Sequence, residues 1–216
     1  DCYKLATVVL GDSIESIKQN AFGYIGNSNS ESTKVYIPSL DWLFRVNIEE
    51  FQNEHLFQDI YIGQQPLTTI TIPDNFTEAP ILKLLYNSCI SSLNTGNGLK
   101  TLPKGESRNI TQVTLGSNVT KVEAEFPEAY IVLSNNATPP AITEKTFPKC
   151  MFDNGAEGVV VLLNTNDQKA YSKAKVWEGM QMSNQSNQVA VQVSAPGSIG
   201  TDLALGLRMP VAKVVG

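Results

Sequence analysis

The sequence has little of the chemistry on which most enzymes depend. Its 216 residues include one histidine, His55, and three cysteines, Cys2, Cys89 and Cys150, with no CxxC spacing among them. Without paired cysteines or clustered histidines, neither a zinc site nor a closed disulfide framework is predicted. His55 has no neighbouring serine, cysteine or ligand motif and is interpreted as a surface residue. No catalytic residue, metal or cofactor is predicted, and the chain is expected not to be an enzyme.

Carboxylate groups are the remaining candidates for acid–base chemistry. Glu49 and Glu50 are adjacent, and Glu123, Glu125 and Glu128 follow one another closely. Two carboxylates can hydrolyse a glycosidic bond when one of them has a raised pKa. Nothing in the surrounding sequence predicts such a shift, so these residues are interpreted as a solvated face.

Long apolar runs and blocks of basic residues are also lacking. No fully apolar run is longer than residues 159–163, which is far shorter than the ~20 residues that span a bilayer. No transmembrane helix is therefore predicted. The chain carries 16 Lys and Arg against 21 Asp and Glu, a net charge of −5. Because nucleic acid requires a basic surface, no nucleic-acid partner is expected.

Polar residues that favour turns and strands are abundant instead. Ser, Thr and Asn make up almost a quarter of the chain, and hydrophobic residues, at 42%, suffice for a core. This composition is typical of a folded, β-rich protein.

An internal repeat is the most informative pattern. When the chain is aligned on Leu5, Leu67, Ile90 and Ile110, the positions at offsets 0, 3, 5, 9 and 12 are apolar in every case except Thr95. The last three anchors are 23 and 20 residues apart, which is within the range of leucine-rich repeats.

The repeat predicts a particular architecture. Apolar residues two positions apart bury one face of a strand, and the later offsets return the chain through a short turn or 3-10 segment. One such coil cannot bury its own apolar face, whereas stacked coils can. The sequence therefore predicts a solenoid, a β-rich leucine-rich-repeat fold of the α/β horseshoe class. It has a parallel strand ladder, with short helices and 3-10 turns on the other side.

Several stretches resemble one family of repeat proteins. Residues 5–22 (LATVVLGDSIESIKQNAF) and residues 67–74 (LTTITIPD) resemble the repeat of BspA-like leucine-rich-repeat surface proteins, which are abundant in gut anaerobic bacteria. Residues 34–66, which include KVYIPSLDW and IYIG, resemble a variant unit with a short helix and a hairpin. Residues 137–181, which open with ATPPAITEKTF, resemble the unit that closes many arrays. The array is expected over residues 1–181.

The remaining residues change in character. Residues 182–188 are polar and without period, and are interpreted as a linker. Residues 189–216 open with the alternating stretch VAVQV and are interpreted as a separate β-rich segment, which resembles the start of a further module.

Two helices are predicted within the array. Apolar residues at helical spacing predict an amphipathic helix over residues 40–52. A capping box at 165–168 predicts a second helix with Ala170, Ala174 and Trp177 on one face. Trp42 and Trp177 are interpreted as core residues.

The outward strand positions are the candidate binding face. One stripe contains Val9, Tyr36, Tyr61, Thr71, Thr114 and Val132, and a second contains Thr7, Thr69 and Gln112. Six of these residues are the candidate site: Tyr36, Tyr61, Thr69, Thr71, Gln112 and Thr114.

Together with the family resemblance, this face implies a secreted or cell-surface recognition module. It is expected to be a monomer that binds a protein or glycan on a host or microbial surface. The alternative is a structural spacer that displays another domain. A binder is expected to keep a contiguous, aromatic-rich outward stripe, whereas the stripe of a spacer is expected to be evenly polar.

Overall fold

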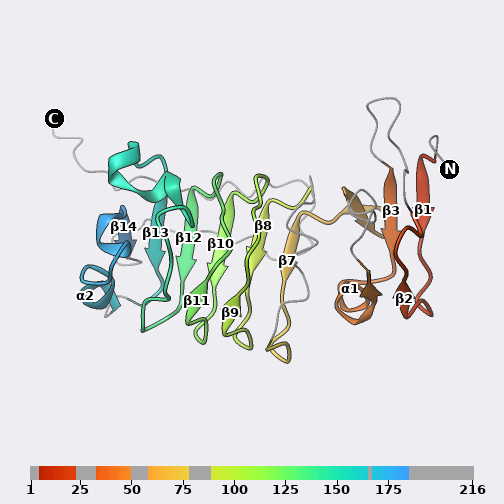
Figure 1. Ribbon diagram of the computed structural model, residues 1–216, viewed down its shortest axis with the longest axis horizontal. Coiled ribbons are helices and arrows are strands. Elements are labelled where there is room, and N and C mark those ends of the chain that lie inside the picture. Colours follow the sequence, from red (N-terminus) through yellow and green to blue (C-terminus); the bar gives the residue numbers. More distant parts are fainter. Residues whose placement is uncertain (1–4, 23–32, 50–57, 78–88, 165–166, 185–216) are drawn as a thin grey trace.

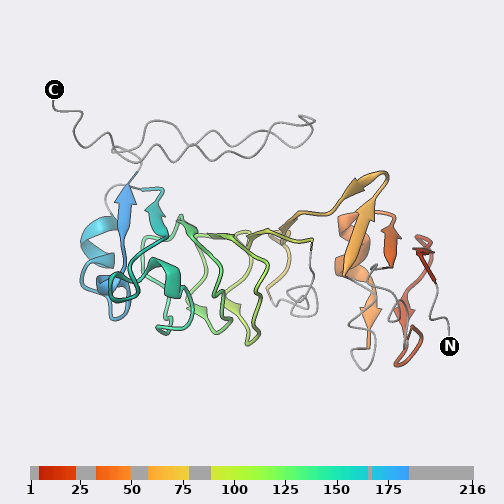
Figure 2. The same cartoon turned by 90° about the horizontal axis from the view of Figure 1, so that it is seen from above.

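Strands dominate the molecule (Figure 1). The structure is a computed structural model in which residues 5–22, 33–49, 58–77, 89–164 and 167–184 are described. Most of the strand pairs among these residues are parallel, and the helices are short. The prediction of a β-rich fold with parallel strand pairing is therefore confirmed. The strands form two larger sheets at opposite ends of an elongated molecule (Figure 2).

The first sheet has the strand order β1-β3-β5-β6. Its members are β1 (Thr7–Val9), β3 (Lys34–Ile37), β5 (Asp59–Ile62) and β6 (Gln65–Pro66). The first three pair in parallel, with Val8, Val35 and Ile60 buried in one registered row. β6 runs antiparallel to β5, and the chain reverses at Gly63, whose φ of 61° favours glycine.

The second sheet is a parallel ladder with the order β14-β13-β12-β10-β8-β7. Its members are β7 (Thr69–Thr71), β8 (Ser92–Asn94), β10 (Gln112–Leu115), β12 (Ile131–Ser134), β13 (Val159–Leu162) and β14 (Met182–Asn184). One registered row is completely buried and contains Ile70, Leu93, Val113, Val132 and Val160. The strand pairing includes Met182–Asn184, at the start of the stretch interpreted as a linker.

Short strand pairs lie at offset 12 of the repeat, after the predicted turns. β2 (Ser16–Ile17) pairs with β4 (Asn47–Ile48), and β9 (Thr101–Leu102) pairs with β11 (Lys121–Val122). The predicted short turns lie just before these pairs, where the backbone N–H groups of Ile14, Phe76 and Val119 donate to the carbonyl oxygens of Gly11, Pro73 and Gly116. Consecutive passes of the chain lie side by side at these pairs, and their backbone groups therefore bond to one another.

Most of the aligned repeat positions are buried. Leu67, Ile90 and Ile110 are all buried, but Leu5, which was expected to be buried with them, is 37% exposed. Leu5 precedes β1, the edge strand of the first sheet, and among the described residues no strand lies beyond β1 to cover it. Ala79, the offset-12 residue of the second copy, lies outside the described residues.

Thr95 shows how a polar residue is accommodated at an inward position. Its side chain is completely buried. The Oγ1 atom accepts the backbone N–H of Gly116 at 2.8 Å and donates to the carbonyl oxygen of Gly96 at 3.3 Å. Both hydrogen-bonding functions of the hydroxyl are therefore satisfied, which removes most of the cost of burying it.

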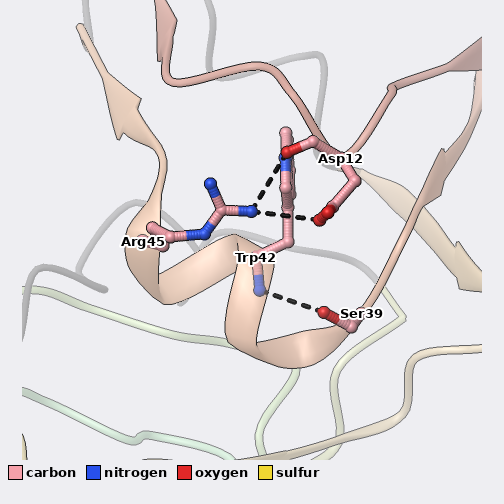
Figure 3. Close-up of polar contacts among 4 residues, drawn as sticks. All are labelled: Asp12, Ser39, Trp42 and Arg45. Atoms are coloured by element: carbon pink, nitrogen blue, oxygen red, sulfur yellow. Dashed lines mark hydrogen bonds and ion pairs between the residues drawn. The ribbon is translucent and has the colours of Figure 1, made fainter.

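The first helix, α1 (Leu40–Arg45), is shorter than the predicted range 40–52. Its N-cap, Ser39, accepts the backbone N–H of Trp42 at 3.1 Å, and the Arg45 guanidinium bonds Asp12 at 3.0 Å (Figure 3). The helix ends because Val46 is extended and the next residues join β4, whose pairing with β2 prevails over helical spacing. Trp42 is 1% exposed, which confirms its interpretation as a core residue.

The predicted second helix is interrupted. α2 (Gln168–Tyr171) is a single turn, and Trp177 lies in a separate 3-10 turn, η6 (Trp177–Gly179). Val176, between the two, has a φ of 73° and breaks the helical path. The capping box falls partly on residues 165–166, which lie outside the described residues. Trp177 is 1% exposed and is a core residue, as predicted.

Two buried aromatic side chains of the core, those of Trp177 and Tyr171, are hydrogen-bonded. The Trp177 indole N–H donates to the carbonyl oxygen of Pro140 at 2.7 Å. The Tyr171 hydroxyl lies 2.6 Å from the Ser134 hydroxyl and donates to the carbonyl oxygen of Asn136 at 3.1 Å. Two 3-10 turns, η3 (Pro148–Cys150) and η4 (Phe152–Asn154), lie before β13 in the sequence.

We expect this region to make the protein sensitive to alkali. Burial raises the pKa of the Tyr171 hydroxyl from 10.0 to about 12 and that of the Cys150 thiol from 9.0 to about 12. Both groups are neutral when protonated, and their pKa values are higher in the folded state. Their contribution to stability is therefore complete below pH 9 and is lost as the pH rises toward 12.

The urea midpoint measured between pH 8 and pH 12 checks this expectation. It is expected to be constant up to about pH 9 and then to fall. Tyr171→Phe is expected to flatten the decline above pH 10, because phenylalanine does not ionise. A wild-type midpoint that stays constant across the whole range would contradict the prediction.

Candidate functional site

An aromatic and apolar row lies on the outward face of the first sheet. The strand register places Val9 beside Tyr36, Tyr36 beside Tyr61, and Tyr61 beside Pro66. Side chains at directly paired positions point to the same side of a sheet, so the four form one row. Val9 is 75% exposed, Pro66 is also exposed, and the tyrosines are half-buried.

Pro66 is a member of this row that sequence reasoning missed. Pairing of Ile62 with Gln65 in the hairpin at Gly63 places Pro66 opposite Tyr61. The sequence predicted a hairpin in this unit but not which residues pair across it, so the position of Pro66 could not be assigned from the sequence.

Tyr36 and Tyr61 stack on each other. Their ring centroids lie 5.1 Å apart and the ring planes make an angle of 27°. Neighbouring strands are about 4.8 Å apart, so registered aromatic side chains on β3 and β5 meet nearly face to face. The Lys34 Nζ lies 5.7 Å from the centroid of the Tyr61 ring, within the range of a cation–π contact. The pair is therefore held in one arrangement before any partner binds.

Charged residues flank the tyrosines. Lys34 and Asp59 occupy paired positions two residues before Tyr36 and Tyr61 on the same strands. Residues two apart in a strand share a face, so a cation and an anion border the aromatic pair. This face therefore combines apolar area with both signs of charge.

The other candidate residues lie on the second sheet. Thr69 and Gln112 fall in one outward row with Ser92 between them, and Thr71 and Thr114 fall in the next row with Asn94 between them. The structure thus brings these four together, but on a different sheet from Tyr36 and Tyr61. Ser92 and Asn94 were not predicted, although they flank the buried Leu93 and the repeat alignment contained this information.

Val132 does not belong to the outward stripe. It is completely buried, and it pairs with Val113, whereas Thr114 pairs with Leu133. The prediction took Val132 instead of Leu133 as the outward position of β12. An error of one residue along a strand moves a side chain to the opposite face. All four residues of β12 are buried, so alternation did not reveal which face was outward.

Several of the carboxylates considered for acid–base chemistry lie in ion pairs. Within the described part of the chain, no group of three or more His, Cys, Asp and Glu residues could hold a metal ion. The carboxylates of Glu49, Glu123 and Glu128 each pair with a lysine, at 2.9, 2.7 and 2.7 Å. A hydrogen bond from Lys121 lowers the pKa of Glu123, whereas a general acid needs a raised one. His55, Glu50 and Cys2 lie outside the described residues.

Comparisons with known proteins add no relative. No family model matches the sequence, and no curated protein matches it. Within the described part of the chain, no helix combines the length and the apolar character needed to cross a membrane.

Proposed function

We propose that this chain is a non-enzymatic recognition or adhesion module that binds a protein or a glycan through the outward face of its strands. The stacked tyrosines in the outward row of the first sheet carry the proposal. The row of four aromatic and apolar side chains lies on the face opposite the buried row of Val8, Val35 and Ile60. Such residues supply much of the binding energy at interfaces.

The proposal includes a leucine-rich-repeat solenoid similar to BspA-like surface proteins. Its support is the parallel pairing of successive strands, with a buried residue of each strand in one row from Ile70 to Val160. The repeat spacing of 20 and 23 residues agrees with this arrangement. In this reading the module is extracellular or attached to the cell surface, acts as a monomer, and takes its ligand from a host or microbial surface.

The ring geometry suits a ligand that contacts both ring edges and flanking polar groups. Stacking covers one face of each tyrosine, which leaves the ring edges and the hydroxyl groups for a partner. Because the rings and Lys34 already contact each other, little side-chain freedom is lost on binding. Val9 and Pro66 extend the apolar contact on either side.

A structural spacer is the second candidate, and the outward face of β7, β8 and β10 favours it. The side chains there are evenly polar and contain no aromatic residue: Thr69, Thr71, Ser92, Asn94, Gln112 and Thr114. A spacer needs only such a solvated face. The two candidates therefore differ in whether the first sheet binds anything.

Replacement of both tyrosines tests the proposal. Tyr36→Ala combined with Tyr61→Ala is expected to leave the fold intact and to weaken retention on a glycan and matrix-protein array about tenfold or more. A second variant, Thr69→Ala combined with Gln112→Ala, alters the polar face of the second sheet, and wild-type retention of this variant would assign the contact to the first sheet. If no spot retains the wild type, the spacer is favoured. If the tyrosine variant is retained as well as the wild type, the tyrosine row is not the binding site.

A further inference from the structure

The sequence contains two Asn-Gly pairs, and the structure places both of them in turns. Asn97-Gly98 follows β8, and Asn154-Gly155 lies at the end of η4. Both asparagines are exposed. Because glycine has no Cβ to shield its backbone nitrogen, an Asn-Gly pair is a place where that nitrogen can attack the asparagine side chain. The two pairs are alike in sequence, so their surroundings decide whether they react.

Hydrogen bonds from the neighbouring turns on both sides hold Asn97. Its backbone N–H donates to Asp74 Oδ1 at 2.6 Å, and its side-chain amide donates to Asp74 Oδ2 at 3.4 Å. On the other side, Asn97 Oδ1 accepts the backbone N–H and the hydroxyl group of Ser117, both at 3.1 Å. The Asn97 amide is therefore bonded through its nitrogen and its oxygen, to the turn after β7 and to the turn after β10.

Gly98 is enclosed by backbone atoms. A Cβ added there would lie 2.0 Å from the carbonyl oxygen of Asp74 and 2.6 Å from that of Phe76. The backbone at Gly98 therefore has little room to move toward the Asn97 side chain. Ring closure between the two residues requires the turn after β8 to separate from the turn after β7.

The surroundings of Gly155 are open. A Cβ added there meets no atom within 4 Å. The Gly155 N–H donates to the carbonyl oxygen of Phe152 at 3.0 Å, and the Asn154 side-chain amide donates to that of Pro148 at 3.2 Å. Both acceptors belong to the adjoining 3-10 turns, η3 and η4. Such turns have poor hydrogen-bond geometry, and their local opening leaves the sheet paired.

We propose that Asn154 is a site of spontaneous deamidation and that the contacts around Asn97 protect it from the same reaction. The Gly155 backbone nitrogen attacks Cγ of Asn154, and the new C–N bond closes a succinimide ring. The side-chain nitrogen leaves as ammonia, with the proton of the Gly155 N–H. Water then adds to either carbonyl carbon of the ring and opens it, which yields aspartate or isoaspartate. Each product places a new negative charge beside Asp153.

The test compares two sites within one full-length chain. The protein is incubated in mildly alkaline buffer, and tryptic peptides are then analysed by mass spectrometry, which locates each asparagine that has become acidic. In native protein, Asn154 is expected to convert at least about tenfold faster than Asn97, because its reaction needs only local opening. In concentrated urea the two sites are expected to convert at similar rates, since the contacts that distinguish them are lost.

A matched pair of variants tests the protection of Asn97. Asp74→Ala removes two hydrogen bonds to Asn97 and is expected to accelerate its conversion several-fold, with no change at Asn154. Asp12 lies seven residues after the repeat anchor Leu5, as Asp74 does after Leu67. Asp12→Ala is therefore the same change in the turn after β1, and it is expected to leave both rates unchanged.

Equal rates at Asn154 and Asn97 in the native protein would overturn the proposal. An Asn154 that stays intact while the chain in urea converts at both sites would also overturn it. A folded Asp74→Ala variant with an unchanged rate at Asn97 would reject the protective role of these contacts. If Asp74→Ala fails to fold, the ratio of the two wild-type rates in native buffer, compared with the ratio in urea, still decides.

Discussion

Replacement of Gly116 by alanine is expected to lower the free energy of unfolding by about 3 kcal/mol or more. A Cβ at this position would lie 1.6 Å from the carbonyl oxygen of Gly96 and 2.6 Å from its carbonyl carbon. Both are backbone atoms, so no side chain can rotate to relieve the clash. The turns that follow β8 and β10 would have to separate, with loss of the hydrogen bond from the Gly116 N–H to Thr95 Oγ1.

Gly11 provides the matched control for this substitution. It follows β1 much as Gly116 follows β10, yet a Cβ added there meets no atom within 4 Å. Gly11→Ala is expected to change the free energy of unfolding by no more than about 0.5 kcal/mol. Urea denaturation followed by circular dichroism measures both variants. Equal midpoints for Gly116→Ala and the wild type would show that the turns of this ladder are not in backbone contact.

Truncation of Trp177 to alanine is the second large effect, an expected loss of about 3–5 kcal/mol. The indole is 1% exposed and packs against the Tyr171 ring at 5.0 Å and the Phe147 ring at 6.2 Å between centroids. Its removal leaves a cavity and deprives the Pro140 carbonyl of its hydrogen-bond donor. Urea denaturation measures the loss, and the fluorescence of Trp42, the remaining tryptophan, reports on the first sheet.

Two further variants distinguish packing from general sensitivity to mutation. Phe152→Ala removes a 58%-exposed aromatic side chain near the same end and is expected to cost no more than about 0.5 kcal/mol. Trp177→Phe keeps most of the apolar volume and is expected to fall between the wild type and Trp177→Ala. Similar losses for Phe152→Ala and Trp177→Ala would contradict the assignment of Trp177 to the core.

Buried positions were predictable where apolar residues recur at fixed offsets. Leu93, Val113 and Ile70 were identified from the repeat and lie in one buried row, because the burial of a strand face depends on alternation that is visible in the sequence. The outward placement of Tyr36 and Tyr61 follows from the same alternation. Their stacking does not, since it depends on the register between two strands that are separated in sequence.

Helix boundaries, by contrast, were not predictable from the sequence. The apolar spacing from Leu40 to Ile48 is helical, but Ile48 pairs with Ile17 in a strand. A local pattern contains no information about a partner strand 31 residues away, and the backbone bonds to that partner decide the conformation. The same limit explains why Leu5 was expected to be buried, because its exposure depends on whether a neighbour covers the edge strand.

The amino-acid sequence by itself determined the β-rich character, the parallel pairing and most of the inward-facing residues, because these follow from composition, from the internal repeat and from alternation within strands. Only the tertiary structure decided which strand lies beside which. It divided the strands between two sheets, aligned Pro66 with Tyr61, and placed Leu133 rather than Val132 beside Thr114. These properties depend on register and on contacts between distant segments, and a uniformly apolar strand such as β12 carries no local signal for either.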